Sequence, residues 1–108
     1  MITNKFIDIV IQSARKKIIY TPHALDEMNK ERELISTEDV RSVLFNGRII
    51  EDSPEDKRGH SCLIAGFSNG DRCIHVVCAP KIEYLAIITT YVPDTEKWEP
   101  GFMSRRKK

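Results

Sequence analysis

The chain has 108 residues, of which 41% are hydrophobic and 31% are charged. This composition is typical of one globular domain, and it excludes an intrinsically disordered chain. The longest apolar runs, such as residues 85–88, are too short to cross a bilayer, and the N-terminal stretch has an acid where a secretory signal would be apolar. Three cysteines without an export signal predict reduced thiols and a cytoplasmic location.

The net charge of +1 conceals an uneven distribution. Residues 105–108 read Arg-Arg-Lys-Lys, and without them thirteen basic residues face sixteen acidic ones, a net charge of −3. A basic run can bind a phosphate backbone, but at a chain end it more often only favours solubility. We expect the second case, with residues 93–108 wrapping the edge of a sheet and then fraying.

The first half of the sequence has the spacing of helices. Hydrophobic residues over 4–17 recur at helical spacing, and a short extended piece follows at 18–20. Thr21-Pro22 is a helix start, which predicts a helix over 22–32 with Leu25 and Met28 on its inner face.

A second start signal opens the next helix. Ser36-Thr37-Glu38-Asp39 resembles a capping box, and Asn46-Gly47 predicts an end with glycine in the left-handed conformation. From this point the periodicity becomes that of strands, at 48–51, 61–67, 72–79 and 84–92, with a hairpin turn at 68–71. The order predicts a single α+β domain, in which N-terminal helices pack on one face of an antiparallel sheet of about four strands.

The histidines are the first candidates for chemistry. His23 lies in the first turn of a predicted helix, with Glu27 one turn later on the same face. His75 lies mid-strand among apolar neighbours, where a histidine is either a hydrogen-bonded core residue or a functional one. His60, in a polar loop, is expected to be exposed.

Three further side chains could act beside the histidines. Tyr91 ends the last strand, where a tyrosine usually packs with its hydroxyl at the rim. Arg32 and Arg58 could bind phosphate, although arginines after helices and in loops mostly face water.

The cysteines and His75 lie near one another in the sequence, which could suggest a metal site, but their spacing argues against one. Cys73 and His75 alternate onto one face of their strand, whereas Cys78 points to the other. A tetrahedral site needs its ligands to converge, so the pattern predicts structural cysteines and no metal.

Several short motifs together resemble a known family. They are Thr21-Pro22-His23-Ala24, residues 36–40 leading to Gly47, Ile49-Ile50-Glu51-Asp52, Ser61-Cys62-Leu63, Ile74-His75-Val76-Val77, Ile87-Ile88-Thr89-Thr90-Tyr91, Pro93-Asp94, Lys97-Trp98 and Pro100. The set resembles domain-of-unknown-function family 4258 (DUF4258) over roughly residues 18–106. On this resemblance residues 1–17 form a helix outside the family match, 18–104 form the core, and 105–108 are a basic tail.

Members of that family look like relatives of the RelE and BrnT toxins, which are small α+β proteins that cleave RNA without metal. The resemblance therefore implies a RelE-like fold, RNA as substrate, no cofactor, no membrane and an antitoxin partner, possibly one with a zinc-binding CxxC domain. By position it implies catalytic roles for His23, His75 and Tyr91. This chain departs from the pattern at Glu27, where related proteins often have arginine.

The implied reaction is attack of a ribose 2′-hydroxyl on its own 3′-phosphate. Either histidine would be the base, the other histidine or Tyr91 would protonate the leaving oxygen, and Arg58 or Arg32 would stabilise the phosphorane. The alternative is a non-enzymatic protein-interaction module, in which the histidines are structural and the first helix docks a partner. The near-neutral charge is consistent with that alternative.

Overall fold

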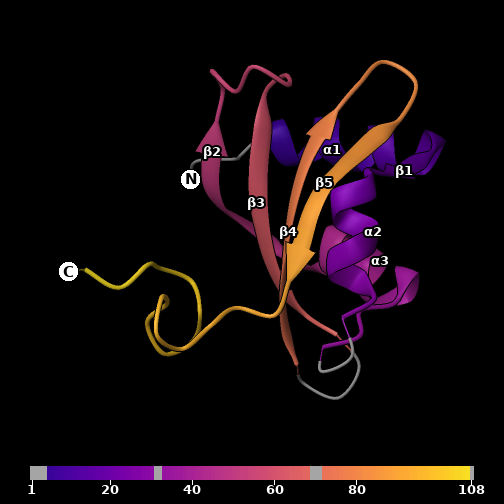
Figure 1. The fold of residues 1–108 in the computed structure, drawn as a ribbon. Coiled ribbons are helices and arrows are strands. Elements are labelled where there is room, and N and C mark those ends of the chain that lie inside the picture. Colours follow the sequence, from indigo (N-terminus) through magenta and orange to yellow (C-terminus); the bar gives the residue numbers. More distant parts are fainter. Residues whose placement is uncertain (1–4, 31–32, 69–71, 108) are drawn as a thin grey trace.

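The computed structural model describes residues 5–30, 33–68 and 72–107. In order along the chain, the elements are α1 (Lys5–Lys16), β1 (Ile18–Tyr20), α2 (Pro22–Met28), α3 (Thr37–Asn46), β2 (Arg48–Ser53), β3 (Ser61–Phe67), β4 (Cys73–Pro80) and β5 (Leu85–Tyr91) (Figure 1). The predicted α+β class is confirmed.

The strands form one sheet in the order β1-β5-β4-β3-β2. Strands β2 to β5 are antiparallel neighbours, whereas β1 runs parallel to β5 through the pairs Ile18↔Leu85 and Tyr20↔Ile87. Within the residues that the structure describes, the sheet thus has five strands rather than about four. The short piece at 18–20 was expected to be extended, but its pairing with a strand so far along the chain has no local signal.

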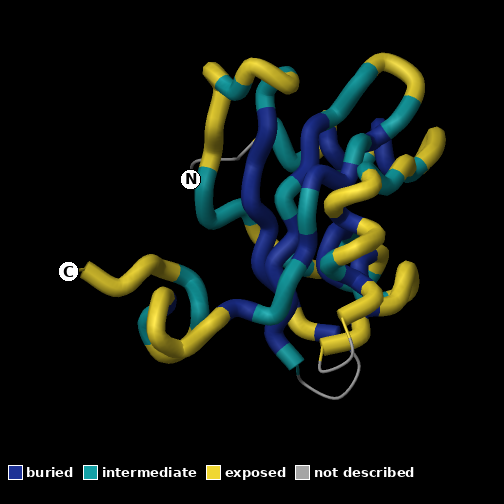
Figure 2. The backbone as a smooth tube through the Cα atoms, viewed as in Figure 1, coloured by how far each residue is buried: buried dark blue, intermediate teal, exposed yellow. Residues whose placement is uncertain are grey.

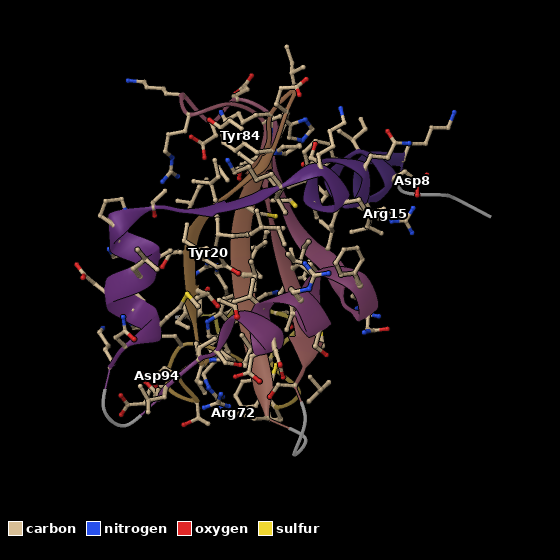
Figure 3. The ribbon with its side chains drawn as sticks, turned by 90° about the vertical axis from the view of Figure 1, so that its right-hand side faces the viewer. Asp8, Arg15, Tyr20, Arg72, Tyr84 and Asp94 are labelled. Atoms are coloured by element: carbon tan, nitrogen blue, oxygen red, sulfur yellow. The ribbon has the colours of Figure 1, made fainter. Side chains whose placement is uncertain are left out.

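The three helices cover one face of this sheet, which we call the inner face. Figure 3 looks onto this helical layer, with the strands behind it. The core between the layers contains Val10, Ala14, Ala24, Met28, Val40, Val43 and Leu44 from the helices and Ile64, Ile74, Val76, Cys78, Leu85 and Ile87 from the strands. Alternation along β4 sends Cys73, His75 and Val77 to the opposite, outer face.

Two helix starts are confirmed with their caps. The Thr21 hydroxyl accepts a hydrogen bond from the Ala24 N–H, and Pro22 occupies the first turn without losing a donor. At the next helix, the Ser36 hydroxyl accepts the Asp39 N–H while the Asp39 carboxylate accepts the Ser36 N–H, which completes the capping box.

Helix α2 is shorter than predicted, because it ends at Met28 and not at residue 32. Its inner face is also different, since Ala24 and Met28 are buried while Leu25 is 45% exposed. Residues four apart lie on one face of a helix, and Leu25 is rotated by about 100° from Ala24. In so short a segment, the spacing of the apolar residues was compatible with burial of either face of the helix.

Gly47 was expected in the left-handed conformation, but its φ of −86° and ψ of −172° are extended. Glycine is needed for another reason. A Cβ here would lie 2.5 Å from both the Val43 and the Ala65 carbonyl oxygens. The missing side chain therefore lets the end of α3 approach β3 at backbone distance.

Three contacts fasten α1 to the rest of the molecule. Phe6 stacks on His60 with ring centroids 3.6 Å apart, the Ser13 hydroxyl donates to the Lys81 carbonyl, and the Lys16 ammonium donates to the Ile82 carbonyl. His60 also contacts the Asp52 carboxylate. It is therefore a partnered side chain at the join between a helix and a turn, and not the plain exposed histidine that was expected.

The C-terminal residues 92–107 lie against the outer face of the sheet, on the side away from the helices (Figure 1). Much of this segment is exposed, in contrast to the buried central strands (Figure 2). Pro93 and Trp98 are buried, and Trp98 is only 2% exposed because it packs on the outer face. The basic end does not fray at its start, since Arg105 and Arg106 are both held by hydrogen bonds.

Candidate functional site

The outer face carries a polar cleft with a volume of about 370 Å³. We call it the polar cleft. Its walls come from α2, the turn at 54–60, strands β2 to β5 and the C-terminal segment. The lining residues are His23, Glu51, Ser53, Asp56, Arg58, Ser61, Cys62, Leu63, Val77, Ile88, Thr89, Tyr91 and Arg105.

Three of the five residues predicted from the sequence meet in this cleft: His23, Arg58 and Tyr91. They come from the first turn of α2, from the turn at 54–60 and from the end of β5. His75 is paired with Tyr91 across β4 and β5 and is fully buried. Arg32 lies outside the described residues.

His23 is an exposed side chain on the edge of the cleft. Its helix is tied to β5 because the Thr21 hydroxyl donates to the Ile88 carbonyl at 2.9 Å, and the Thr21 N–H donates to the Ile87 carbonyl at 3.1 Å. Glu27 pairs with Lys30 at 2.7 Å instead of holding the His23 ring. The imidazole is therefore positioned by its backbone and stays accessible to a ligand.

A bulge in β5 shapes the floor of the cleft. The pairing changes register between Val77↔Thr89 and Cys78↔Ile87, so Ile88 has no partner across the strand pair. As a result, the consecutive side chains of Ile88 and Thr89 both line the cleft. A bulge commonly redirects side chains in this way beside a functional site.

Tyr91, which is half-buried, contacts the fully buried His75 on the neighbouring strand. The His75 Nε2–H donates to the Phe102 carbonyl at 2.8 Å, which leaves Nδ1 to accept the Tyr91 hydroxyl at 3.4 Å. Burial lowers the pKa of His75 below the ordinary imidazole value, so the ring is neutral near pH 7. Burial also raises the pKa of Tyr91, which keeps its hydroxyl protonated and able to donate.

The C-terminal segment packs against this pair through Trp98. Trp98 packs edge-on against the His75 ring at a centroid distance of 4.4 Å, and the Arg105 guanidinium lies 4.6 Å from the centre of the Trp98 ring. Arg105 donates two hydrogen bonds to the Glu51 carboxylate, at 2.6 and 3.0 Å. The segment thereby links β2 to β4 across the outer face.

Arg105 is a positively charged cleft residue that the sequence did not single out. The sequence placed Arg105 in a basic tail that was expected to favour solubility. Its membership of that basic run was its only signal in the sequence. In the structure it enters the cleft, and its positive charge lowers the pKa of Tyr91 against the effect of burial. A group in that position favours a phenolate if Tyr91 gives up its proton.

Arg58 lines the cleft from the turn at 54–60, where hydrogen bonds hold it. Its guanidinium donates to both oxygens of the Asp56 carboxylate, at 3.0 and 2.9 Å, and Asp56 also accepts the Ser61 hydroxyl at 2.7 Å. These hydrogen bonds hold the pKa of Asp56 well below its usual range. The Lys81 ammonium donates to the Arg58 carbonyl, which fastens the turn to the β4–β5 connection.

The charges in the cleft nearly balance. Each arginine faces a carboxylate, Arg58 with Asp56 and Arg105 with Glu51. An anion entering the cleft would meet guanidinium groups that are already paired, although their side chains are 62% and 57% exposed. Binding of phosphate here must therefore compete with two ion pairs that water partly screens.

The cysteines occupy the positions that strand alternation predicts. Cys62 and Cys78 lie opposite each other on β3 and β4, with their sulfur atoms 3.9 Å apart in the core, and all three thiols are free. Cys73 points to the other face with His75. Among residues 5–30, 33–68 and 72–107, no three histidine, cysteine or acidic side chains cluster closely enough to hold a metal ion.

Together, the fold and the cleft define a small α+β protein with a polar site on the open face of its sheet. Residues 20–92 match the family described as "Domain of unknown function (DUF4258)", and the chain belongs to this family. The match ends before Trp98 and Arg105 and begins after α1. Searches of curated proteins and of solved structures found no significant match. None of the helices within the described residues is long and apolar enough to span a bilayer.

Proposed function

We propose that this protein is a metal-independent endoribonuclease of the RelE and BrnT toxin type, acting in the cytoplasm and paired with an antitoxin protein. The observation that supports it is the convergence of His23, Arg58 and Tyr91 in one cleft, together with Arg105. These are the side chains of a base, an acid and two phosphate ligands, and they come from four separate parts of the chain. The resemblance to those toxins supplies the reaction class.

In the proposed reaction, His23 accepts the proton of a ribose 2′-hydroxyl. The 2′-oxygen forms a bond to the adjacent phosphorus, and the bond from phosphorus to the 5′-oxygen breaks. The Tyr91 hydroxyl turns away from His75 Nδ1 and gives its proton to that leaving oxygen, so the products are a 2′,3′-cyclic phosphate and a 5′-hydroxyl. His23 suits the first role because it is the exposed imidazole of the cleft, and Tyr91 suits the second because burial keeps it protonated.

The arginines would stabilise the charge that builds up on the phosphorane. Arg58 and Arg105 both line the cleft, and each is paired with a carboxylate in the free protein. Arg105 has a second role, because its charge favours the phenolate that Tyr91 becomes. His75 is a positioning residue on this scheme, because its ring is fully buried and acts on the reaction only through the Tyr91 hydroxyl.

The test is cleavage of single-stranded RNA by the purified protein, with growth arrest on induction in a bacterial host as a second readout. We expect His23→Gln and Tyr91→Phe each to slow cleavage by about 10²–10⁴-fold. The matched controls are His60→Gln and Tyr84→Phe, which change the same residue types outside the cleft. They should cleave at the wild-type rate, and all four variants should keep wild-type circular dichroism spectra.

One observation favours a second candidate function, a protein-interaction module. Both arginines are already paired, and the near balance of charge weakens the attraction for RNA. Folded wild-type protein that neither cleaves RNA nor arrests growth would refute the ribonuclease and favour this second candidate. In that case the exposed apolar side chains Ile9 and Ile82, which line a common groove beside α1, are the first surface to substitute.

A further inference from the structure

A second pocket lies next to the polar cleft and has the opposite character. It has a volume of about 330 Å³, and its exposed surface is almost entirely apolar. We call it the alanine pocket. Its lining side chains are Thr21, His23, Arg58, Ala79, Lys81, Ala86 and Ile88. The volume falls in the range of about 300–1,000 Å³ that is typical of small-molecule sites.

The floor of the alanine pocket is made by two small residues. Ala79 and Ala86 are directly opposite each other on β4 and β5, and Ile88 forms the wall towards the polar cleft. Opposed residues in an antiparallel pair have their Cβ atoms about 4.5–5.5 Å apart, so two methyl groups make a flat apolar surface. Such a surface suits a planar ring better than a branched side chain.

The rim of the pocket is rigid. Asp56 fixes the plane of the Arg58 guanidinium, and Lys81 holds the Arg58 carbonyl from the other side. Gly59 allows the Lys81 ammonium to approach the Arg58 carbonyl. Its φ of +106° is unfavourable for other residues, and a Cβ there would lie 2.8 Å from the Lys81 nitrogen. A guanidinium held in one plane at the edge of a flat apolar floor is a stacking surface for an aromatic ring.

The alanine pocket and the polar cleft share three lining residues, His23, Arg58 and Ile88. One ligand that spans both must therefore carry a planar apolar group and an anionic group a short distance apart. A nucleotide has this composition, since its base and its phosphate are joined through a single ribose.

We propose that the alanine pocket binds the nucleobase of the nucleotide whose 3′-phosphate lies in the polar cleft. On this arrangement the ribose between them presents its 2′-hydroxyl to His23, the side chain at the boundary. The proposal deepens the ribonuclease function and rests on it. It makes Ala79, Ala86 and Arg58 the residues that set the affinity for the base on the 5′ side of the cut.

The test uses small ligands that cannot be cleaved. These are the 3′,5′-bisphosphates of 2′-deoxyuridine and 2′-deoxyguanosine, compared with the bisphosphate of the same sugar without a base. Stacking of one base contributes about 1–3 kcal/mol, so we expect wild type to bind at least one of the two nucleotides about 5–150-fold more tightly than the abasic ligand. Calorimetry or NMR titration on the full chain measures all three.

Ala86→Leu fills the floor of the pocket and is the variant to compare. We expect its affinity for either nucleotide to fall to the abasic value while its affinity for the abasic ligand stays unchanged. Ala86→Ser keeps the volume and is the matched control, and Ala86→Val is a smaller filling substitution if leucine lowers the melting temperature. A folded filled variant that still prefers the base overturns the proposal.

The outcomes in the wild type separate this proposal from the proposed function. Equal affinity for nucleotides and abasic ligand overturns the base pocket while leaving phosphate recognition by the cleft intact. No binding of any bisphosphate contradicts the ribonuclease itself, and the base pocket with it.

Discussion

We expect the main effect of replacing His75 with alanine to be a loss of stability, and its effect on RNA cleavage to be secondary. The ring is fully buried, donates to the Phe102 carbonyl and packs edge-on against Trp98 and Tyr91. Losing that donor leaves a carbonyl unsatisfied, which costs about 1–3 kcal/mol, and each aromatic contact contributes about 0.5–1.5 kcal/mol. We therefore expect His75→Ala to lower the free energy of unfolding by about 3 kcal/mol.

Thermal unfolding measures this loss directly. In a domain of about this size, 1 kcal/mol shifts Tm by about 4–8 °C, so a loss of about 3 kcal/mol should lower Tm by about 12–24 °C. His75→Gln is the matched variant, because its amide can still donate towards Phe102, and it should lose less. A Tm that is unchanged in His75→Ala would refute the packing and hydrogen-bond argument.

The same variants separate a positioning residue from a catalytic one. At a temperature where His75→Gln is folded, its RNA cleavage should stay within about tenfold of wild type, whereas Tyr91→Phe should fall by the larger factor of about 10²–10⁴ expected for an acid. Equal losses in the two variants would mean that His75 takes part in proton transfer, as the sequence alone allowed.

The lowered pKa of His75 also predicts how stability depends on pH. The unfolded imidazole titrates near 6.5 and the folded one lower, so the unfolded state binds more protons between the two values. The contribution is fully present above pH 6.5 and is lost as the pH falls through that window towards the folded pKa. Urea unfolding at pH 7.5 and pH 5 should show the fall in wild type and less of it in His75→Gln.

Three further predictions concern other parts of the molecule. Gly47→Ala should cost about 3 kcal/mol by overpacking against two carbonyl oxygens, whereas Gly101→Ala, with a φ of +89° and open space around it, should cost about 1–2 kcal/mol, as chemical denaturation can test. Ser36→Ala removes one half of the capping box and should lower Tm by about 4–8 °C, a loss of about 1 kcal/mol. Glu51→Gln releases Arg105 from its ion pair and should tighten binding of single-stranded RNA roughly 2–5-fold at low salt, with an unchanged Kd counting against a role for Arg105 in phosphate binding.

The local features of the fold were predictable because their signals are local. Thr21 and Ser36 start helices in any context that lets a hydroxyl reach an amide two or three residues on, and both do so here. The strand at 61–67 was also predicted with its observed bounds. Gly47 was recognised as a special position, but the reason for it is a contact with β3, which no neighbouring residue signals.

The candidate site was only partly predictable. His23, Arg58 and Tyr91 were proposed on residue type and family resemblance, and the structure brings them together. Arg105 was missed because its meaning depends on Glu51, a partner 54 residues away in the sequence. A basic run at a chain end has the same sequence pattern whether it is solvated or packs on a sheet.

The parallel pairing of β1 with β5 has a consequence for how the molecule is made. Ile18 pairs with Leu85, 67 residues further along the chain, and the Thr21 hydroxyl that positions α2 donates to a carbonyl that is also 67 residues further on. Contacts between such distant residues form late and slow the folding of a domain. We therefore expect His23 to reach the cleft late in folding, and a chain that ends before β5 lacks Ile88, Thr89 and Tyr91 and so carries no assembled cleft.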